Sequence, residues 1–249
     1  MFSGDQVQNI LLFPVRDEDA RKKFLVASLV TLAGFIIPVL PWLVLYGYVV
    51  RMMRQVIDEN REPSMPEWTD WNELVIDGLR FLAIRLVITI PLLIVLGFGV
   101  LLGLVPVLLA MSDPNSAHGE ALTAFVILGN CLWLAVFMLA ALISIPLTVI
   151  MAAAETHMAS KRSLSAAFQV REWWPIFRKS AGWFVLSYLL VMAVSVVGSI
   201  VIQVLIFTIV FICLLPFFLM PYSAYILMVL YAFYARAYAQ GRAQLPTPA

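Results

Sequence analysis

Few residues in the long apolar stretches of this sequence are of a type that could do chemistry. Arg85 lies one to two turns inside one apolar stretch, and Glu155 lies at the end of the next one. Ionisable side chains at membrane depth are costly and commonly mark functional or paired sites. We expect both residues near the same membrane face, where they could form an ion pair across a helical bundle. The alternative is that Arg85 extends its guanidinium to the interface while Glu155 meets water.

The two histidines do not indicate a metal centre or a catalytic site. His118 lies in a short loop near Asp113 and Glu120, and His157 follows Glu155 by two residues. Neither histidine has the spacing of a helical metal-binding motif, and no nucleophile is paired with a base in a recognisable context. We therefore expect no catalytic residue, no metal ligand and no cofactor, and we expect the protein not to be an enzyme.

Other polar and small residues in the apolar stretches suit helix packing. Asn130 and Gln203 could each donate or accept a hydrogen bond between neighbouring helices. Gly99 and Gly103 form a small-residue motif, which allows two helices to approach closely. The sequence does not tell whether such packing is internal or involves another chain.

The composition indicates the environment in which these residues lie. Of the 249 residues, 63% are hydrophobic and 12% are charged, whereas soluble domains carry about 25% charged residues. Apolar stretches longer than 18 residues predict a multi-pass membrane protein, and residues 1–249 are expected to form a single domain. The lipid bilayer is thus an expected partner. The net charge of +1 gives no reason to expect nucleic acid.

The apolar stretches predict an all-α, polytopic transmembrane helical bundle with about four full spans. About 20 apolar residues are enough to cross the bilayer core. The spans are expected at residues 79–111, 121–154, 180–206 and 207–235. Residues 1–23 form a polar tail of mixed charge, without the apolar core of a signal peptide.

Lysine and arginine gather in four places along the chain. These are the N-terminal tail, the connections 51–80 and 155–180, and the C-terminal end, whereas the loop 112–120 has none. Because basic loops stay on the cytoplasmic side, we expect all four places, and both termini, on the cytoplasmic side of the cell membrane. The four spans satisfy this rule as two out-and-back pairs.

The first apolar stretch, residues 24–50, does not satisfy this rule as a simple span. One crossing would place the basic tail outside, and two crossings would need about 40 residues. Pro38 and Pro41 interrupt the stretch, and proline disfavours a continuous helix. We therefore favour a re-entrant hairpin that begins and ends on the cytoplasmic side. A single kinked span is the alternative.

Two connections have the pattern of amphipathic helices that lie in the membrane interface. The first is expected at residues 64–78, where Ser64 and Glu67 fit a capping box at the helix start. The second follows the same theme near residue 173. Tryptophans near cations are typical of headgroup anchors. Four are expected to act in this way: Trp68, Trp71, Trp173 and Trp174. A docking surface for a soluble partner or a lipid headgroup is the alternative.

The sequence over residues 10–90 is similar to a known family. The matching pieces are Phe13-Pro14, Arg16-Asp17, Lys22-Lys23, Gly47-Tyr48 with Arg51 and Arg54, Pro66-Glu67, Asp70-Trp71 and Asp77-Gly78-Leu79. They resemble the prokaryotic integral membrane family labelled domain of unknown function 4013, and the likeness is weaker beyond residue 90. The resemblance implies a prokaryotic, multi-span helical protein and implies no activity.

These observations favour a non-enzymatic accessory or scaffold subunit of a larger membrane assembly. The spans are almost uniformly apolar and have no charged pathway, so other membrane protein subunits are expected partners. The alternative is a small transporter or lipid-handling protein. A weak repeat between the two halves of the chain and the interruptions at Pro38-Pro41 and Pro216-Pro221 favour this alternative.

Overall fold

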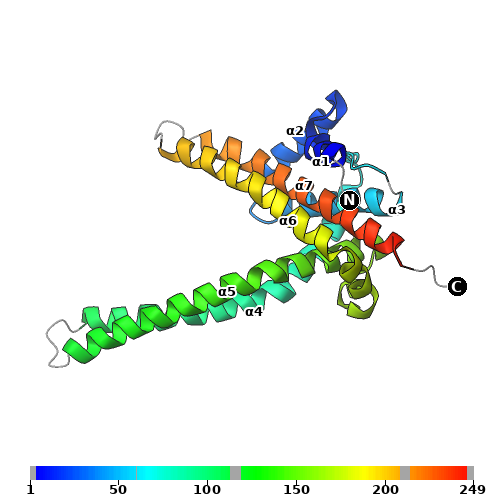
Figure 1. Ribbon diagram of the computed structural model, residues 1–249. Coiled ribbons are helices and arrows are strands. Elements are labelled where there is room, and N and C mark those ends of the chain that lie inside the picture. Colours follow the sequence, from blue (N-terminus) through cyan, green and yellow to red (C-terminus); the bar gives the residue numbers. More distant parts are fainter. Residues whose placement is uncertain (1–3, 60, 113–118, 208–213, 246–249) are drawn as a thin grey trace. The chain divides into compact units, whose positions relative to one another are not determined.

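The computed structural model describes residues 4–59, 61–112, 119–207 and 214–245, and these residues form helices and connecting segments without a strand (Figure 1). The helices are α1 (Gly4–Leu12), η1 (Phe13–Val15), α2 (Glu18–Ala33), α3 (Leu40–Asp58), α4 (Trp71–Ser112), α5 (Gly119–Lys161), η2 (Leu164–Phe168), α6 (Val170–Phe207) and α7 (Leu215–Ala243). The predicted all-α fold is confirmed.

Four of these helices are long and apolar enough to cross a membrane, as the sequence predicted. The qualifying segments are Thr89–Ser112, Glu120–Lys161, Val170–Phe207 and Leu215–Ala243. Each backbone amide within such a helix is satisfied by the helix itself, which a lipid environment requires. The protein is thus a multi-pass membrane protein. Part of the expected last span, residues 208–213, lies outside the described residues.

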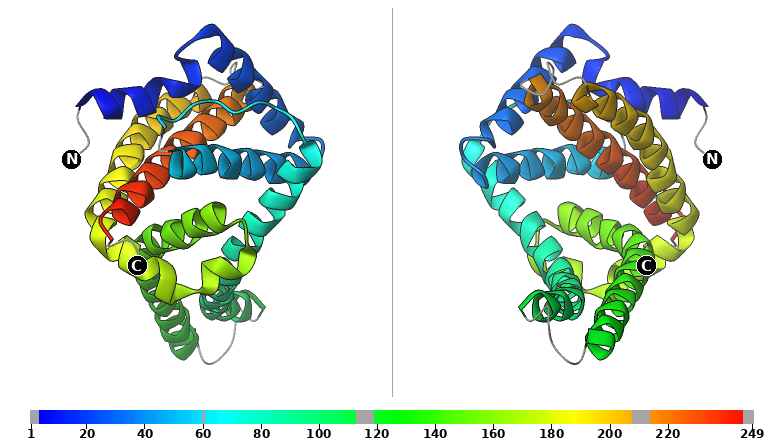
Figure 2. Two further views of the ribbon diagram at one scale, coloured as in Figure 1. Left: turned by 90° about the vertical axis from the view of Figure 1, so that its right-hand side faces the viewer. Right: turned by 90° about the vertical axis from the view of Figure 1, so that its left-hand side faces the viewer.

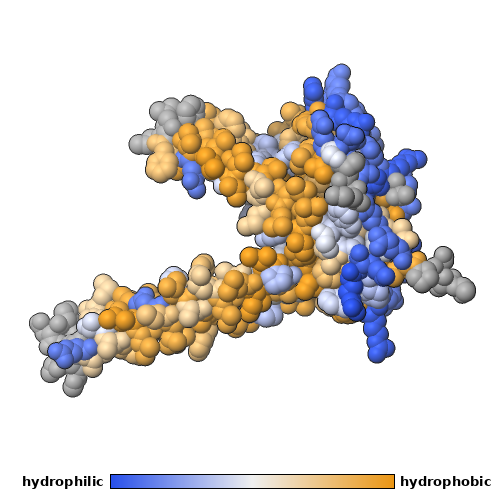
Figure 3. Space-filling model, viewed as in Figure 1, coloured by the Kyte–Doolittle hydropathy of each residue, from blue (hydrophilic) through white to orange (hydrophobic). Residues whose placement is uncertain are grey.

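The chain divides into two compact units. Unit 1 comprises Met1–Ile84 and Val149–Ala249, and unit 2 comprises Arg85–Thr148. Polar residues gather over one side of unit 1, whereas apolar side chains cover most of unit 2 (Figure 3). The expectation of one domain over the whole chain stays a prediction.

Helix α7 is the centre of unit 1. It packs against α1, α2, α3 and α6, and Figure 2 shows it running between α3 and α6. Its inward-facing rings are fully buried, among them Tyr231, Phe233 and Tyr234. The ring of Tyr234 stacks on that of Phe184 in α6, and the ring of Tyr231 meets the edge of Phe81 in α4. Aromatic packing therefore joins three helices of unit 1.

The apolar stretch at residues 24–50 is broken in the middle. Helix α2 ends at Ala33, residues 34–39 form a turn, and α3 begins at Leu40. Pro38 lies in the turn and Pro41 in the first turn of α3, where a proline costs no helical hydrogen bond. Helices α2 and α3 then pack against each other. The break lies where the prolines predicted it, while insertion of this hairpin into the membrane stays a prediction.

The helix expected at residues 64–78 begins later than predicted. Residues 61–70 are not helical, and α4 starts at Trp71. The predicted capping box is therefore wrong, since Ser64 and Glu67 both precede the helix. The reason is tertiary: the hydroxyl of Tyr48 donates to the carbonyl of Pro66 at 2.8 Å, and the carboxylate of Glu67 pairs with Lys23 at 2.7 Å. These contacts hold the segment extended against its local helical preference.

In unit 2, α4 and α5 pack against each other at the predicted small-residue motif. A Cβ atom on Gly99 would lie 2.9 Å from Cγ1 of Val136, and one on Gly103 would lie 3.2 Å from Cβ of Trp133. A larger residue at Gly99 would force the side chain of Val136, or α5 with it, to shift. The packing at Gly99 and Gly103 is thus internal to the chain.

Candidate functional site

A very close helix crossing lies at the base of the candidate site in unit 1. A Cβ atom on Gly47 of α3 would lie 1.8 Å from the carbonyl oxygen of Leu74 in α4. A Cβ atom on Gly78 of α4 would lie 1.8 Å from the carbonyl oxygen of Leu43 in α3. Only glycine allows the two backbones to touch in this way. The crossing brings the polar residues that follow Gly47 close to those that flank Gly78.

A buried ion pair joins α3 and α4 beside this crossing. The guanidinium of Arg54 donates two hydrogen bonds to the carboxylate of Asp77, and the one from Nη2 to Oδ1 is 2.8 Å long. Arg54 is 7% exposed and Asp77 is 2% exposed. The Nε atom of Arg54 also donates to the carbonyl of Ala159 in α5 at 3.1 Å. Such bidentate geometry is the strongest form of a side-chain ion pair, and it fixes the position of Arg54.

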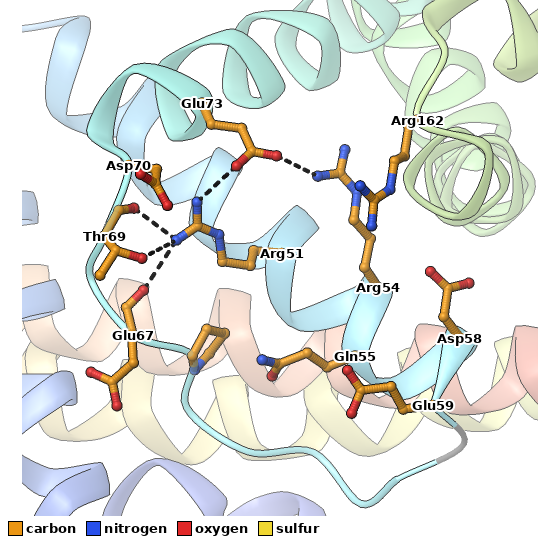
Figure 4. Close-up of a pocket in the computed structure, with 11 residues that line it drawn as sticks. Arg51, Arg54, Gln55, Asp58, Glu59, Glu67, Thr69, Asp70, Glu73 and Arg162 are labelled. Atoms are coloured by element: carbon orange, nitrogen blue, oxygen red, sulfur yellow. Dashed lines mark hydrogen bonds and ion pairs between the residues drawn. The ribbon is translucent and has the colours of Figure 1, made fainter.

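A charged cavity of about 480 Å³ opens next to this pair (Figure 4). We call it the α3 cavity, because four of its lining residues come from that helix and a fifth, Glu59, directly follows it. The lining consists of Arg51, Arg54, Gln55, Asp58, Glu59, Pro66, Glu67, Thr69, Asp70, Glu73 and Arg162. Its volume lies in the range of small-molecule sites, about 300–1,000 Å³. Three arginines and five acidic residues make the described lining amphoteric.

Glu73 neutralises part of the positive charge in the α3 cavity. Its carboxylate lies 3.2 Å from Nη2 of Arg51 and 3.6 Å from Nη1 of Arg54. Arg51 is further held by the carbonyl of Thr69, to which its Nη1 atom donates at 2.7 Å. Arg51 and Arg54 therefore have fixed positions on one wall of the cavity.

Several polar groups that line the α3 cavity, among them Gln55 and Arg162, lack partners among the residues that the structure describes. The Oε1 atom of Gln55 is buried and accepts no hydrogen bond. Arg162, which follows the end of α5, is exposed, and its guanidinium has neither an ion pair nor a hydrogen bond with the described residues. Arg162 and Asp70 also have positive φ angles of 55° and 54°, which are uncommon for residues with a side chain. Strained backbone and buried polar groups without partners, such as the Oε1 atom of Gln55, often coincide with functional sites.

A second, smaller cavity of about 230 Å³ lies on the other side of Asp58, which lines both. Its other lining residues are His157, Ser160, Lys161, Glu172, Ile176, Tyr238 and Arg242. His157 is buried, and its Nδ1 atom lies 2.6 Å from the hydroxyl of Tyr238. Its Nε2 atom lies 3.4 Å from Oε2 of Glu172, a separation that suits an ion pair when the imidazole is protonated, but it has no hydrogen bond.

Glu155 and Arg85, the predicted polar pair, belong to different units of the chain. Glu155 is buried in unit 1 and accepts a hydrogen bond from the hydroxyl of Tyr231. Arg85 is the first residue of unit 2. Their mutual ion pair stays a prediction. His157, for which no role was expected, lines the second cavity, whereas His118 lies outside the described residues.

The four tryptophans expected at the membrane interface differ in their surroundings. Trp68 stacks on Tyr48 with ring centroids 3.9 Å apart, and its indole donates to the carbonyl of Lys23. Trp173 is 5% exposed, and its indole donates to the carbonyl of Ala167, so it packs inside unit 1. Trp71 and Trp174 are exposed. An anchoring role stays a prediction, and these two rings are the ones available for it.

Sequence reasoning did not bring together the residues that define the α3 cavity. Arg51, Arg54 and Asp77 were named only among the pieces that resemble a known family, and no contact between them was predicted. A signal was present in their spacing. Arg54 lies two helical turns after Gly47, and Asp77 directly precedes Gly78, so each charge lies within two turns of a glycine at which the backbones touch.

The comparisons with known proteins give a family and no activity. The model of the family described as "Protein of unknown function (DUF4013)" matches residues 30–211, well over half of the chain. No curated protein matches the sequence, and no solved structure matches the fold.

Proposed function

Since the chain belongs to the DUF4013 family of proteins of unknown function, its role must be argued from its own residues, and we propose that it is a non-enzymatic accessory subunit of a larger membrane assembly. The single observation that carries this proposal is a pair of amide side chains exposed on apolar helices. Asn130 of α5 and Gln203 of α6 are both exposed.

Each amide is poorly satisfied for a group at the surface of an apolar helix. The side chain of Asn130 donates only to the carbonyl of Val126 in its own helix, at 2.9 Å. Gln203 has no side-chain hydrogen bond among the residues that the structure describes. Lipid offers no partner to such groups, and in membrane proteins Asn and Gln commonly hydrogen-bond to a neighbouring helix. A second protein surface would satisfy them.

The low burial of the long helices supports the same role. Only 11% of the most apolar window of α5 and 6% of that of α6 are buried. Large side chains such as Leu128 and Val197 are more than half exposed. These faces are free for lipid or for other subunits, and the exposed amides favour subunits at Asn130 and Gln203.

Native purification in mild detergent, followed by cross-linking and mass spectrometry, tests this proposal. We expect a stoichiometric membrane protein partner, with cross-links near Asn130 or Gln203. Asn130→Leu and Gln203→Leu should reduce the amount of that partner that co-purifies with the protein. The control Ile127→Leu, which changes no polar group on α5, should not reduce it. Recovery of the wild-type chain alone, from gently solubilised membranes, would contradict the proposal.

A second candidate, a lipid-handling protein, is favoured by one observation in unit 2. An apolar groove of about 240 Å³ runs between α4 and α5, and its described lining has no polar side chain. It includes Phe98, Pro106 and Leu132. A groove of this kind suits an acyl chain. Co-purification of a defined lipid with a lone protein would move the proposal to this function.

A further inference from the structure

We propose that the α3 cavity binds a zwitterion that carries an anionic phosphate group and a primary ammonium group, as phosphoethanolamine does. The inference concerns unit 1 alone and does not depend on the accessory role. It follows from Arg162 and Gln55, two groups of the cavity without partners among the described residues. Arg162 is exposed and can bind an anion from solution, and the buried Oε1 atom of Gln55 can accept a hydrogen bond from a donor.

The anionic group is assigned to the arginine side of the cavity. Figure 4 shows Arg54 and Arg162 extending into it from two different elements, α3 and the segment after α5. Arg54 is already positioned by Asp77, and Arg162 has no partner among the described residues. A phosphate has several acceptor oxygens, so it can take hydrogen bonds from both guanidinium groups at once. The carboxylate of Glu73, which is about half exposed, closes the same wall.

The ammonium group is assigned to the side formed by Gln55 and Asp58. The Oε1 atom of Gln55 is a buried acceptor without a donor. Asp58 is exposed, and its carboxylate has no partner among the residues that the structure describes. A primary ammonium carries three N–H donors, which would satisfy both acceptors and place a positive charge beside Asp58. Burying an unpaired acceptor is unfavourable, so a donor at this point stabilises the site.

The same groups discriminate against a quaternary ammonium. Choline has no N–H donor, and proteins recognise it through aromatic cages. The described lining of the α3 cavity has no aromatic ring. The site therefore distinguishes phosphoethanolamine from phosphocholine by hydrogen bonding and not by charge or size alone.

Two sources could supply this chemistry, a phosphatidylethanolamine headgroup or a free zwitterion. The full-length protein in a phosphate-free detergent is titrated calorimetrically with O-phosphoethanolamine and with phosphocholine. In parallel, native mass spectrometry compares retained lipid after reconstitution in phosphatidylethanolamine and in phosphatidylcholine. Binding in the first assay identifies a free zwitterion, and selective retention in the second alone identifies the lipid.

Matched variants connect the binding to the cavity. Arg162→Gln and Gln55→Met should each lower the affinity for the ethanolamine-containing ligand by about tenfold or more, the loss expected for one charge-assisted hydrogen bond. Arg171→Gln removes an exposed arginine outside the cavity and should leave binding unchanged. Gln55→Met should also leave the melting temperature unchanged or raised, since it removes an unpaired acceptor, so a lowered affinity does not reflect unfolding.

Three results would overturn the proposal. One is the absence of ethanolamine-selective binding in both assays. Another is equal affinity for phosphocholine, which would eliminate the ammonium subsite. The third is unchanged binding by Arg162→Gln in a protein that melts like the wild type. None of these results bears on whether the protein has a membrane partner, so the accessory role is tested separately.

Discussion

Arg54 and Asp77, 23 residues apart in the sequence, share two hydrogen bonds in the interior of unit 1. The pair joins α3 to α4, and the bond from Arg54 to the carbonyl of Ala159 adds α5. A buried charge is tolerated only when it is paired and hydrogen-bonded. The pair therefore holds three helices in register at the base of the α3 cavity.

Removing one member of this pair should destabilise unit 1 strongly. Among the described residues, Arg54→Met leaves the carboxylate of Asp77 with one side-chain donor, the partly exposed Arg80. Asp77→Leu leaves the guanidinium of Arg54 buried without its carboxylate partner. Each single variant should lose about 3–5 kcal/mol, as is usual for a broken buried pair. Thermal melting in detergent measures the loss.

The double variant Arg54→Met with Asp77→Leu is the control for that measurement. It removes both charges together, and should melt much closer to the wild type than either single variant. If the losses of the two single variants simply add in the double variant, the pair is not coupled and the interpretation is wrong.

Substitution of a glycine at the crossing of α3 and α4 should also destabilise unit 1. In Gly47→Ala the new methyl group would overlap the carbonyl oxygen of Leu74, which is backbone and cannot turn away. Helices α3 and α4 must then separate, at a cost of about 1–3 kcal/mol or more. Gly182→Ala is the matched control, because a Cβ there meets no atom within 4 Å. Equal melting temperatures for the two variants would contradict the close crossing.

From the ion pairs of Lys23 we predict that the protein loses stability at alkaline pH. Burial opposes its charge, but hydrogen bonds and attraction from Asp19 and Glu67 outweigh burial and raise the pKa of Lys23. The ordinary pKa of lysine is about 10.4. Because the pKa of Lys23 is higher in the folded state, the protonated lysine stabilises the fold at pH values below the ordinary lysine pKa. This contribution is lost as the pH rises through the folded-state pKa.

Melting curves between about pH 8 and pH 11.5 test the role of Lys23. The wild type should melt above Lys23→Met at neutral pH, and the difference should shrink above about pH 10. Other groups titrate in both proteins and cancel in the comparison. A difference that stays constant over this range would show that the charge of Lys23 does not contribute.

The hairpin made by α2 and α3 predicts a labelling pattern. Single cysteines at Lys22 and Glu59, in a background with Cys131→Ser and Cys213→Ser, should react with an impermeant thiol reagent from the same side of the membrane. A cysteine at Ile36, which is 85% exposed in the turn, should be shielded by lipid. Labelling of Lys22→Cys and Glu59→Cys from opposite sides would instead indicate a single kinked span.

The long helices could be predicted from the sequence because their cause is local. In lipid the backbone must satisfy itself, so a long apolar stretch has few alternatives to a helix. The break between Ala33 and Leu40 was equally local, since Pro38 constrains its own backbone and that of its neighbour. These features depend on residues close in sequence.

The candidate site could not be predicted because its causes are tertiary. The segment at Ser64 carries a helix-start pattern, but Tyr48, Trp68 and Lys23 fix it in an extended form. The pairing of Arg54 with Asp77 depends on a crossing between two glycines whose partners are backbone atoms of the other helix. The spacing of residues along a single helix does not reveal this contact between two helices.

The central place of α7 in unit 1 has a consequence for how the protein is made. The hydroxyl of Tyr225 donates to the carbonyl of Leu11, 214 residues earlier, and Thr31 approaches the carbonyl of Met220, 189 residues later. At about 5–20 residues per second, synthesis takes roughly 10–40 s to bridge such separations. During that interval the N-terminal helices are already outside the ribosome without the surface on which they pack. Unit 1 can therefore be completed only after α7 has been made, and the insertion machinery or the lipid must hold α1, α2 and α3 until that helix arrives.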